Sequence, residues 1–140
     1  MKKIILTPVL LTMISTTLTF GQTKVNSDNI PNVTFCNAAH ENDTIRYSDL
    51  VKCVEITQPY KELKIKSFTV SFLFPPADGK GEALFLDYSN TGGKLSEQIL
   101  DVFKTLEAKK VKKILIEQVV ILDVDGKTER KMKGTVVNLM

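Results

Sequence analysis

The stretch LKIKSFTVSFLF, residues 63–74, carries the clearest strand signal in this sequence of 140 residues. Its first apolar side chains, Leu63 and Ile65, fall in one phase of the alternation, and the later ones fall in the other phase: Phe68, Val70, Phe72 and Phe74. Because alternate residues of a strand face opposite sides of a sheet, an apolar set cannot change phase in a regular strand. The stretch therefore predicts either a β-bulge near Lys66-Ser67 or a strand that crosses between two sheets.

Further strand signals lie on both sides of this stretch, at 33–36, 44–47, 50–56, 82–88, 114–124 and 128–139. Asp125-Gly126 joins the last two runs and is a hairpin signal. Apolar residues recur at helical spacing over 97–109, and Ser96 is suited to cap that helix. The order predicts a mostly β protein, an Ig-like two-sheet β-sandwich with one α-helix inserted before the C-terminal hairpin.

The first residues have the layout of an export signal. Lys2 and Lys3 precede an uncharged apolar stretch over 4–20, and Gly21 offers a small residue at the cleavage point. A retained membrane anchor is the alternative, since a stretch of this length is at the lower limit for a span. We predict a signal peptide over 1–21, a flexible lead over 22–32 and a single domain over 33–140, with no membrane span after cleavage.

The net charge of the chain is +3, from 19 basic and 16 acidic residues. Removing residues 1–21 deletes two lysines and leaves 17 basic and 16 acidic residues, a net charge of +1. That balance, with no groove-reading motif, excludes nucleic acid as an expected partner. Four lysines gather at the end of the predicted helix, where a solvated helix end is the simplest interpretation: Lys109, Lys110, Lys112 and Lys113.

The two cysteines, Cys36 and Cys53, lie seventeen positions apart. In an exported protein an even pair favours a disulfide, which would stabilise the fold by roughly 3 kcal/mol through loop closure. Two free thiols are the first alternative. The second is a reactive Cys36 thiol with His40, the only histidine, as its base. The three residues show no recognised zinc spacing.

Other polar groups give no pattern typical of catalysis or metal binding. Asp123-Val124-Asp125-Gly126 resembles the opening of a calcium loop, but basic residues follow it and a hairpin turn is favoured. Nothing marks Asp78, Glu82 or Asp87 as a catalytic pair. The sequence also lacks the nucleophile-elbow, P-loop and zinc-protease motifs. We therefore predict no enzyme and no catalytic, cofactor-binding or metal-binding residues.

Short motifs follow one another over 31–139: Pro31-Asn32-Val33, residues 43–50, Tyr60, residues 63–72, Ser89-Asn90, Leu95-Ser96-Glu97, residues 114–121, Asp125-Gly126-Lys127 and Arg130-Lys131-Met132. Their order and spacing resemble the C-terminal domain of GldM, a periplasmic component of the gliding-motility and type IX secretion machinery. The resemblance implies a β-sandwich with one helix. GldM carries a transmembrane helix and further domains before this one. This sequence shows neither, so we expect a freestanding exported relative of the family. Lys109-Lys110 stands where the family often has a glycine turn, and the cysteine pair is not part of the family pattern.

These observations predict a non-catalytic, periplasmic or secreted interaction module. It would dock to an envelope or secretion-machinery protein through an edge strand or a sheet face, with no cofactor. Two alternatives stay open. One is a ligand- or carbohydrate-binding sandwich that uses Tyr47, Tyr60 and Tyr88, and the other is an enzyme or redox protein that uses Cys36 and His40. The oligomeric state is left open.

Overall fold

The computed structural model describes residues 33–38 and 42–140. The predicted signal peptide, the lead and His40 lie outside the described residues. Within them the chain is mostly β, with two sheets and two helices, and a helix precedes the C-terminal strands. The mostly β sandwich with a helix is thus confirmed, while an Ig-like strand arrangement stays a prediction.

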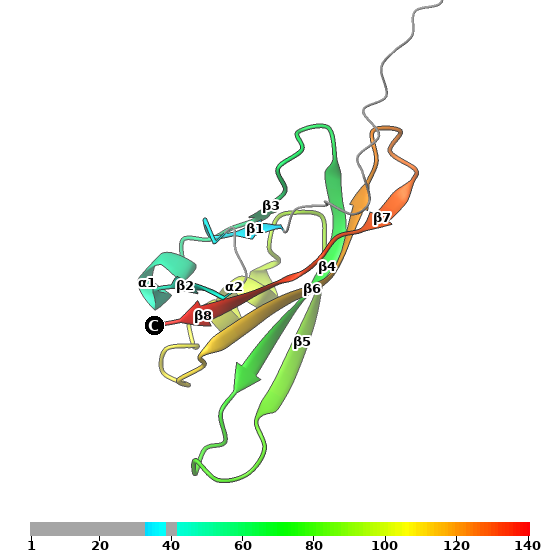
Figure 1. The fold of residues 1–140 in the computed structure, drawn as a ribbon. Helices are drawn as coiled ribbons and strands as arrows, with labels where there is room; N and C mark the ends of the chain where they lie inside the picture. The colour runs from blue at the N-terminus through cyan, green and yellow to red at the C-terminus, as the bar shows by residue number, and fades with distance from the viewer. Residues whose placement is uncertain (1–32, 39–41) are drawn as a thin grey trace, which may run out of the picture.

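The larger sheet has six strands in the order β2–β8–β6–β4–β5, with β7 also paired to β6 (Figure 1). Its strands are β2 (Asp43–Ile45), β4 (Lys64–Phe74), β5 (Leu84–Thr91), β6 (Lys113–Leu122), β7 (Glu129–Lys131) and β8 (Thr135–Leu139). All its pairings are antiparallel except that of β2 with β8.

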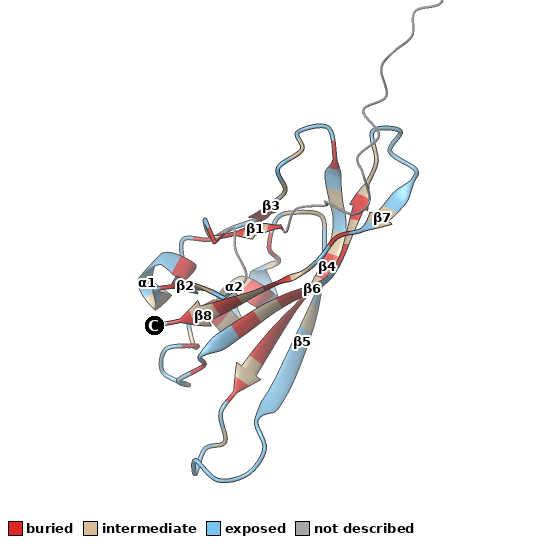
Figure 2. Cartoon of the chain, in the orientation of Figure 1, coloured by how far each residue is buried: buried red, intermediate tan, exposed pale blue. Residues whose placement is uncertain are grey.

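The smaller sheet and the main helix pack on one face of the larger sheet. The smaller sheet pairs β1 (Thr34–Phe35) with β3 (Ile56–Thr57), and the helices are α1 (Tyr47–Leu50) and α2 (Glu97–Phe103). The ring of Phe103 makes T-shaped, edge-to-face contacts with those of Phe35 and Phe72, at centroid distances of 6.0 and 5.9 Å. One core therefore joins β1, α2 and β4 (Figure 2).

The change of phase in β4 is a β-bulge, as the sequence predicts. Pairing with β6 advances from Ile65–Ile121 to Ser67–Val120, so one extra residue lies in β4. The next step, to Thr69–Glu117, places the extra residue in β6, where Gln118 has a positive φ of 50°. The two strands change phase at the same level, and apolar side chains therefore stay on the core face along both.

The strand predictions over 44–56 are partly wrong. Tyr47–Leu50 is a helix, and of the run 50–56 only Ile56 enters a named strand. The buried residues Leu50, Cys53 and Ile56 recur every third position, while Val51 and Val54 are exposed. That spacing is typical of helix and turn rather than of a strand. The β-branched residues here were a misleading signal.

The final strand predicted over 128–139 is interrupted, because the chain must pass the bulge in β6. It forms β7 and β8 separately, with Met132–Gly134 between them. At this passage Gly134 lies so close to β6 that a Cβ placed on it would be 2.0 Å from the carbonyl oxygen of Ile116. Glycine is therefore required here by close approach of two backbones.

Asn90 fixes the end of β5 and the start of α2. Its buried side-chain amide donates to the carbonyl of Lys94 at 2.7 Å, and its amide oxygen accepts from the backbone N–H of Ser96 at 2.8 Å. The hydroxyl of Ser96 in turn accepts from the N–H of Ile99, so the predicted N-cap is confirmed. These bonds fix the C-terminal end of β5 to the start of α2.

Tyr47 connects α1 to the segment before β6. Its hydroxyl donates to the carbonyl of Val111, a fully buried residue, and burial raises the pKa of the phenol, with the charge of Glu107 adding to the rise. Tyr47→Phe should lower the free energy of unfolding by about 1 kcal/mol at pH 7, because the carbonyl loses its donor. A raised pKa contributes stability that is complete below the ordinary phenol pKa and is lost as the pH rises through the folded-state value.

Denaturant unfolding at pH 7 and pH 11 tests this. The gap between the native protein and Tyr47→Phe should shrink at pH 11. Tyr60→Phe removes a hydroxyl from a tyrosine whose hydrogen bonds are made by its backbone, so it serves as the control. An unchanged gap at the two pH values would contradict the assignment.

Candidate functional site

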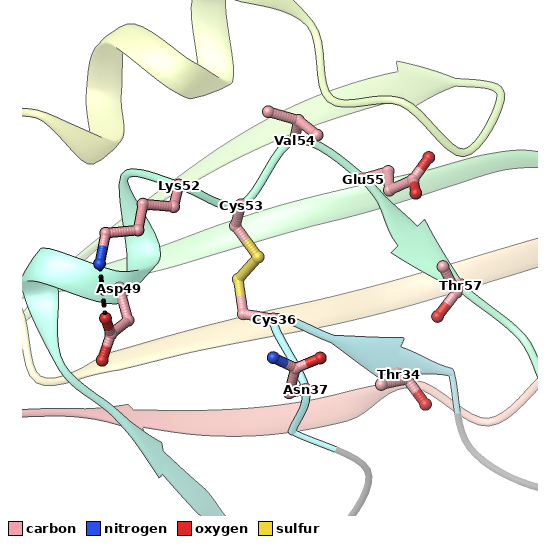
Figure 3. A pocket seen from close by; sticks show the side chains of 9 residues that line it. All are labelled: Thr34, Cys36, Asn37, Asp49, Lys52, Cys53, Val54, Glu55 and Thr57. Atoms are coloured by element: carbon pink, nitrogen blue, oxygen red, sulfur yellow. Dashed lines mark hydrogen bonds and ion pairs between the residues drawn. A yellow bond between two sulfur atoms is a disulfide. The ribbon is translucent and has the colours of Figure 1, made fainter.

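Cys36 and Cys53 form a disulfide, with their Cα atoms 5.4 Å apart. It lies beside an open groove of about 360 Å³ (Figure 3). The groove is lined by Thr34, Cys36, Asn37, Asp49, Lys52, Cys53, Val54, Glu55 and Thr57. Its Lys52–Asp49 ion pair spans 3.1 Å and is largely exposed, and such a pair contributes little to stability. With both sulfurs bonded, neither cysteine offers the free thiol that a Cys36–His40 enzyme needs.

The tyrosines considered for a ligand-binding face are separate. Tyr47 lies in α1, Tyr60 in the loop after β3 and Tyr88 on β5, and each packs against the core. The ring of Tyr88 makes a T-shaped, edge-to-face contact with that of Phe72, with the centroids 5.6 Å apart. The structure therefore places the three rings on three different elements.

The Asp123–Gly126 segment is a hairpin turn. The Asp123 carboxylate accepts from Arg130, and Asp125 accepts from the backbone N–H groups of Lys127 and Thr128, each at 2.8 Å. The hydroxyl of Thr128 also donates to Asp125, and this bond is the main reason that the pKa of that carboxyl is lowered. Both carboxylates thus stabilise the hairpin turn through hydrogen bonds within it. Among residues 33–38 and 42–140, no three metal-ligating side chains lie together.

The carboxylates considered for hydrolysis lie along one hairpin. Asp78 accepts from the backbone N–H of Lys80 in the turn after β4, Glu82 precedes β5, and Asp87 lies on β5. All three are exposed. Nothing in their placement distinguishes them from solvated charges of a surface strand and turn.

The predicted lysine group lies between α2 and β6, and its last member, Lys113, is the first residue of β6. The ammonium of Lys109 lies 5.3 Å from the centre of the Phe74 ring. Lys110 has a φ of 54°, in the left-handed region, and its N–H donates to the carbonyl of Glu107. A lysine thus occupies a left-handed position of this turn, where glycine is common.

The feature that stands out is the free edge of β5. This strand of eight residues pairs with β4 in unbroken register from Ser67–Thr91 to Phe74–Leu84. In the described part of the chain no strand pairs with its other side. It contains no proline and no lysine, two usual means of protecting an edge, and its single charged residue is Asp87.

The direction of the free backbone groups on β5 follows from one hydrogen bond. The N–H of Gly92 donates to the carbonyl of Lys66 at 2.7 Å. In an antiparallel ladder, hydrogen-bonded and non-bonded pairs alternate. Leu84, Leu86 and the other even-numbered residues of β5 therefore direct their N–H and C=O groups to β4, and the odd-numbered residues direct theirs outward.

Apolar side chains accompany this edge. Leu84, Phe85 and Leu86 are 59%, 54% and 36% exposed. Leu84 and Leu86 follow the phase of Phe74 and Phe72, their partners on β4, whereas Phe85 points to the opposite face. The strand is thus apolar on both faces where the β4–β5 hairpin extends past α2 (Figures 1 and 2). We call residues 84–91 with this outward ladder the β5 edge.

The other margins of the large sheet are protected. β2 has only three residues, and Asn42 immediately before it has a φ of 68°. β7 also has three residues, all charged: Glu129, Arg130 and Lys131. Short strands and charged side chains both discourage pairing with another chain. In the described part of the chain, β5 alone is a long edge strand with exposed apolar side chains, at Leu84, Phe85 and Leu86.

Comparison with known proteins adds no assignment: no protein-family model matches the chain, and no curated protein matches it in sequence. As for membrane association, no helix in residues 33–38 and 42–140 combines the length and the apolar character needed to cross a bilayer.

Proposed function

We propose that this chain is a non-catalytic, exported interaction module that resembles the GldM C-terminal domain and docks to an envelope or secretion-machinery protein. One observation carries the proposal, the β5 edge, where free backbone groups and exposed apolar side chains occur together. An edge of this kind accepts a strand of another protein, since main-chain hydrogen bonds supply affinity and flanking side chains supply specificity.

The partner strand would complete the outward ladder of Phe85, Asp87 and Ser89. Because Leu84 and Leu86 are exposed on one face and Phe85 on the other, the partner strand needs apolar side chains on both of its faces. The favourable free energy of docking comes mainly from removing these apolar side chains from water. No bond chemistry is involved.

Export supports the same function. The disulfide between Cys36 and Cys53 is typical of oxidising compartments such as the periplasm, and the predicted signal peptide would deliver the domain there. In this proposal the module acts in the periplasm or outside the cell.

The double substitution Leu84→Lys/Leu86→Lys tests the docking. It places two charges on the exposed edge without touching buried residues, so the fold should persist. Crosslinking and affinity capture from the native envelope should recover a partner with the native protein and at least tenfold less with the variant, since a lysine pair on an edge blocks strand addition. Val124→Lys, at a side chain 72% exposed in the distant hairpin, is the matched control. Equal capture by the double variant and the control would contradict the proposal.

A further inference from the structure

We propose that the β5 edge also pairs with the β5 edge of a second copy of this chain, in antiparallel orientation about a two-fold axis at Phe85. This inference rests on the proposed function to the extent that both use the same edge. The sequence Leu84-Phe85-Leu86 is a palindrome at the point where the edge exposes its large apolar side chains. A two-fold interface requires that kind of self-complementarity, because each residue i that meets j is matched by j meeting i.

The pairing that superposes the palindrome on itself is fixed residue by residue. Phe85 meets Phe85 of the second copy, and Leu84 meets Leu86 in both directions. On one face this extends the β4–β5 row of Leu73 and Phe85 into a row of four apolar side chains. On the other face it extends the Phe74–Leu84 and Phe72–Leu86 pairs in the same way. The exposed apolar side chains of both copies are thereby covered together.

The direction of the backbone groups agrees with this register. Phe85 directs its N–H and C=O outward, so the two Phe85 residues form a hydrogen-bonded pair at the axis. Ala83 and Asp87 form the next such pair on each side, in an antiparallel ladder. A register displaced by one residue would place the odd-numbered residues of one copy opposite the even-numbered residues of the other. The outward N–H and C=O groups would then face residues whose backbone groups point to β4, and they would stay unpaired.

The charges narrow the choice among the remaining registers. Centring the axis on Leu84 would set Leu86 against Glu82, and centring it on Leu86 would set Phe85 against Asp87. An axis at Asp87 would bring two carboxylates together, which is unfavourable. With the axis at Phe85, Asp87 lies opposite Ala83 and Glu82 lies opposite Tyr88, so no like charges meet.

The double substitution Ala83→Cys/Asp87→Cys tests the register while keeping the palindrome intact. In the proposed dimer the cysteine at position 83 of one copy lies opposite the cysteine at position 87 of the other, in a hydrogen-bonded pair. The Cα atoms of such a pair are about 5.5 Å apart, which is within disulfide range. Two disulfides should therefore join the copies on mild oxidation. Within one chain, positions 83 and 87 are roughly 13 Å apart along a strand, too far to be bridged.

The single variants Ala83→Cys and Asp87→Cys are the matched controls, because neither position meets itself across the axis. Non-reducing electrophoresis should show at least tenfold more covalent dimer for the double variant than for either single one. Equal dimer yields from the three variants, each with a native circular dichroism spectrum, would overturn the dimer.

The outcome also separates the two proposals. Register-specific crosslinking together with unchanged partner capture by Leu84→Lys/Leu86→Lys would support the dimer and contradict the proposed function. Equal dimer yields from the three cysteine variants, together with reduced partner capture by Leu84→Lys/Leu86→Lys, would support partner docking and contradict the dimer.

Discussion

Gly134→Ala is expected to destabilise this domain by about 3 kcal/mol or more, at the upper end for overpacking of a well-packed site. The added methyl group would lie 2.0 Å from the carbonyl oxygen of Ile116 and 3.1 Å from its carbonyl carbon. Ile116 pairs with Thr135 in the β6–β8 ladder and with Val70 in the β4–β6 ladder. The clash therefore cannot be relieved by a flexible side chain, and relief requires separating two central strands.

Denaturant unfolding of Gly134→Ala beside Gly79→Ala measures the effect. Gly79 has open space around it and a φ of +69°, so alanine there should cost only about 1 kcal/mol of backbone strain. A destabilisation by Gly134→Ala no larger than that of the control would mean that β8 does not approach β6 as closely as described.

Removal of the disulfide is expected to have an effect of similar size. Cys36→Ala/Cys53→Ala should lower the free energy of unfolding by roughly 3 kcal/mol, the value for closure of a loop of this length. The bond holds β1 to the segment that leads into β3, and these two strands share only two residue pairs. Their buried residues Phe35 and Ile56 should therefore become accessible first.

The matched comparison is the native protein with and without a reductant. The reduced native protein and the double variant should unfold at nearly the same denaturant concentration, well below that of the oxidised protein. Coinciding midpoints for the oxidised protein and the variant would contradict a stabilising disulfide.

The sequence reveals the bulge in β4 because the phase of Phe68 and Val70 conflicts with that of Leu63 and Ile65. The matching bulge in β6 is harder to see. Its buried residues change phase between Ile116 and Val119, but the half-exposed neighbours on this strand are also apolar: Leu115, Val120 and Leu122. Because apolar residues fill both phases on either side of Glu117-Gln118, the change of phase is hidden, and the interruption between β7 and β8 also escaped prediction.

The β5 edge shows a different limit of sequence analysis. The strand over 82–88 is visible in the sequence, but the sequence does not show that Leu84, Phe85 and Leu86 are exposed. Whether a strand lies at the margin of a sheet depends on pairings between distant segments. Only the strand order β2–β8–β6–β4–β5 shows that this apolar strand has one free side.

Amide hydrogen exchange along β5 tests the central claim most directly. In the dilute protein, the amides of Phe85, Asp87 and Ser89 point outward and should exchange quickly, whereas those of Leu86 and Tyr88 donate to β4 and should be protected. On addition of the captured partner, docking at the β5 edge should slow exchange at the odd-numbered amides and leave the even-numbered ones unchanged. Undiminished exchange at Phe85, Asp87 and Ser89 with the partner bound would contradict the account.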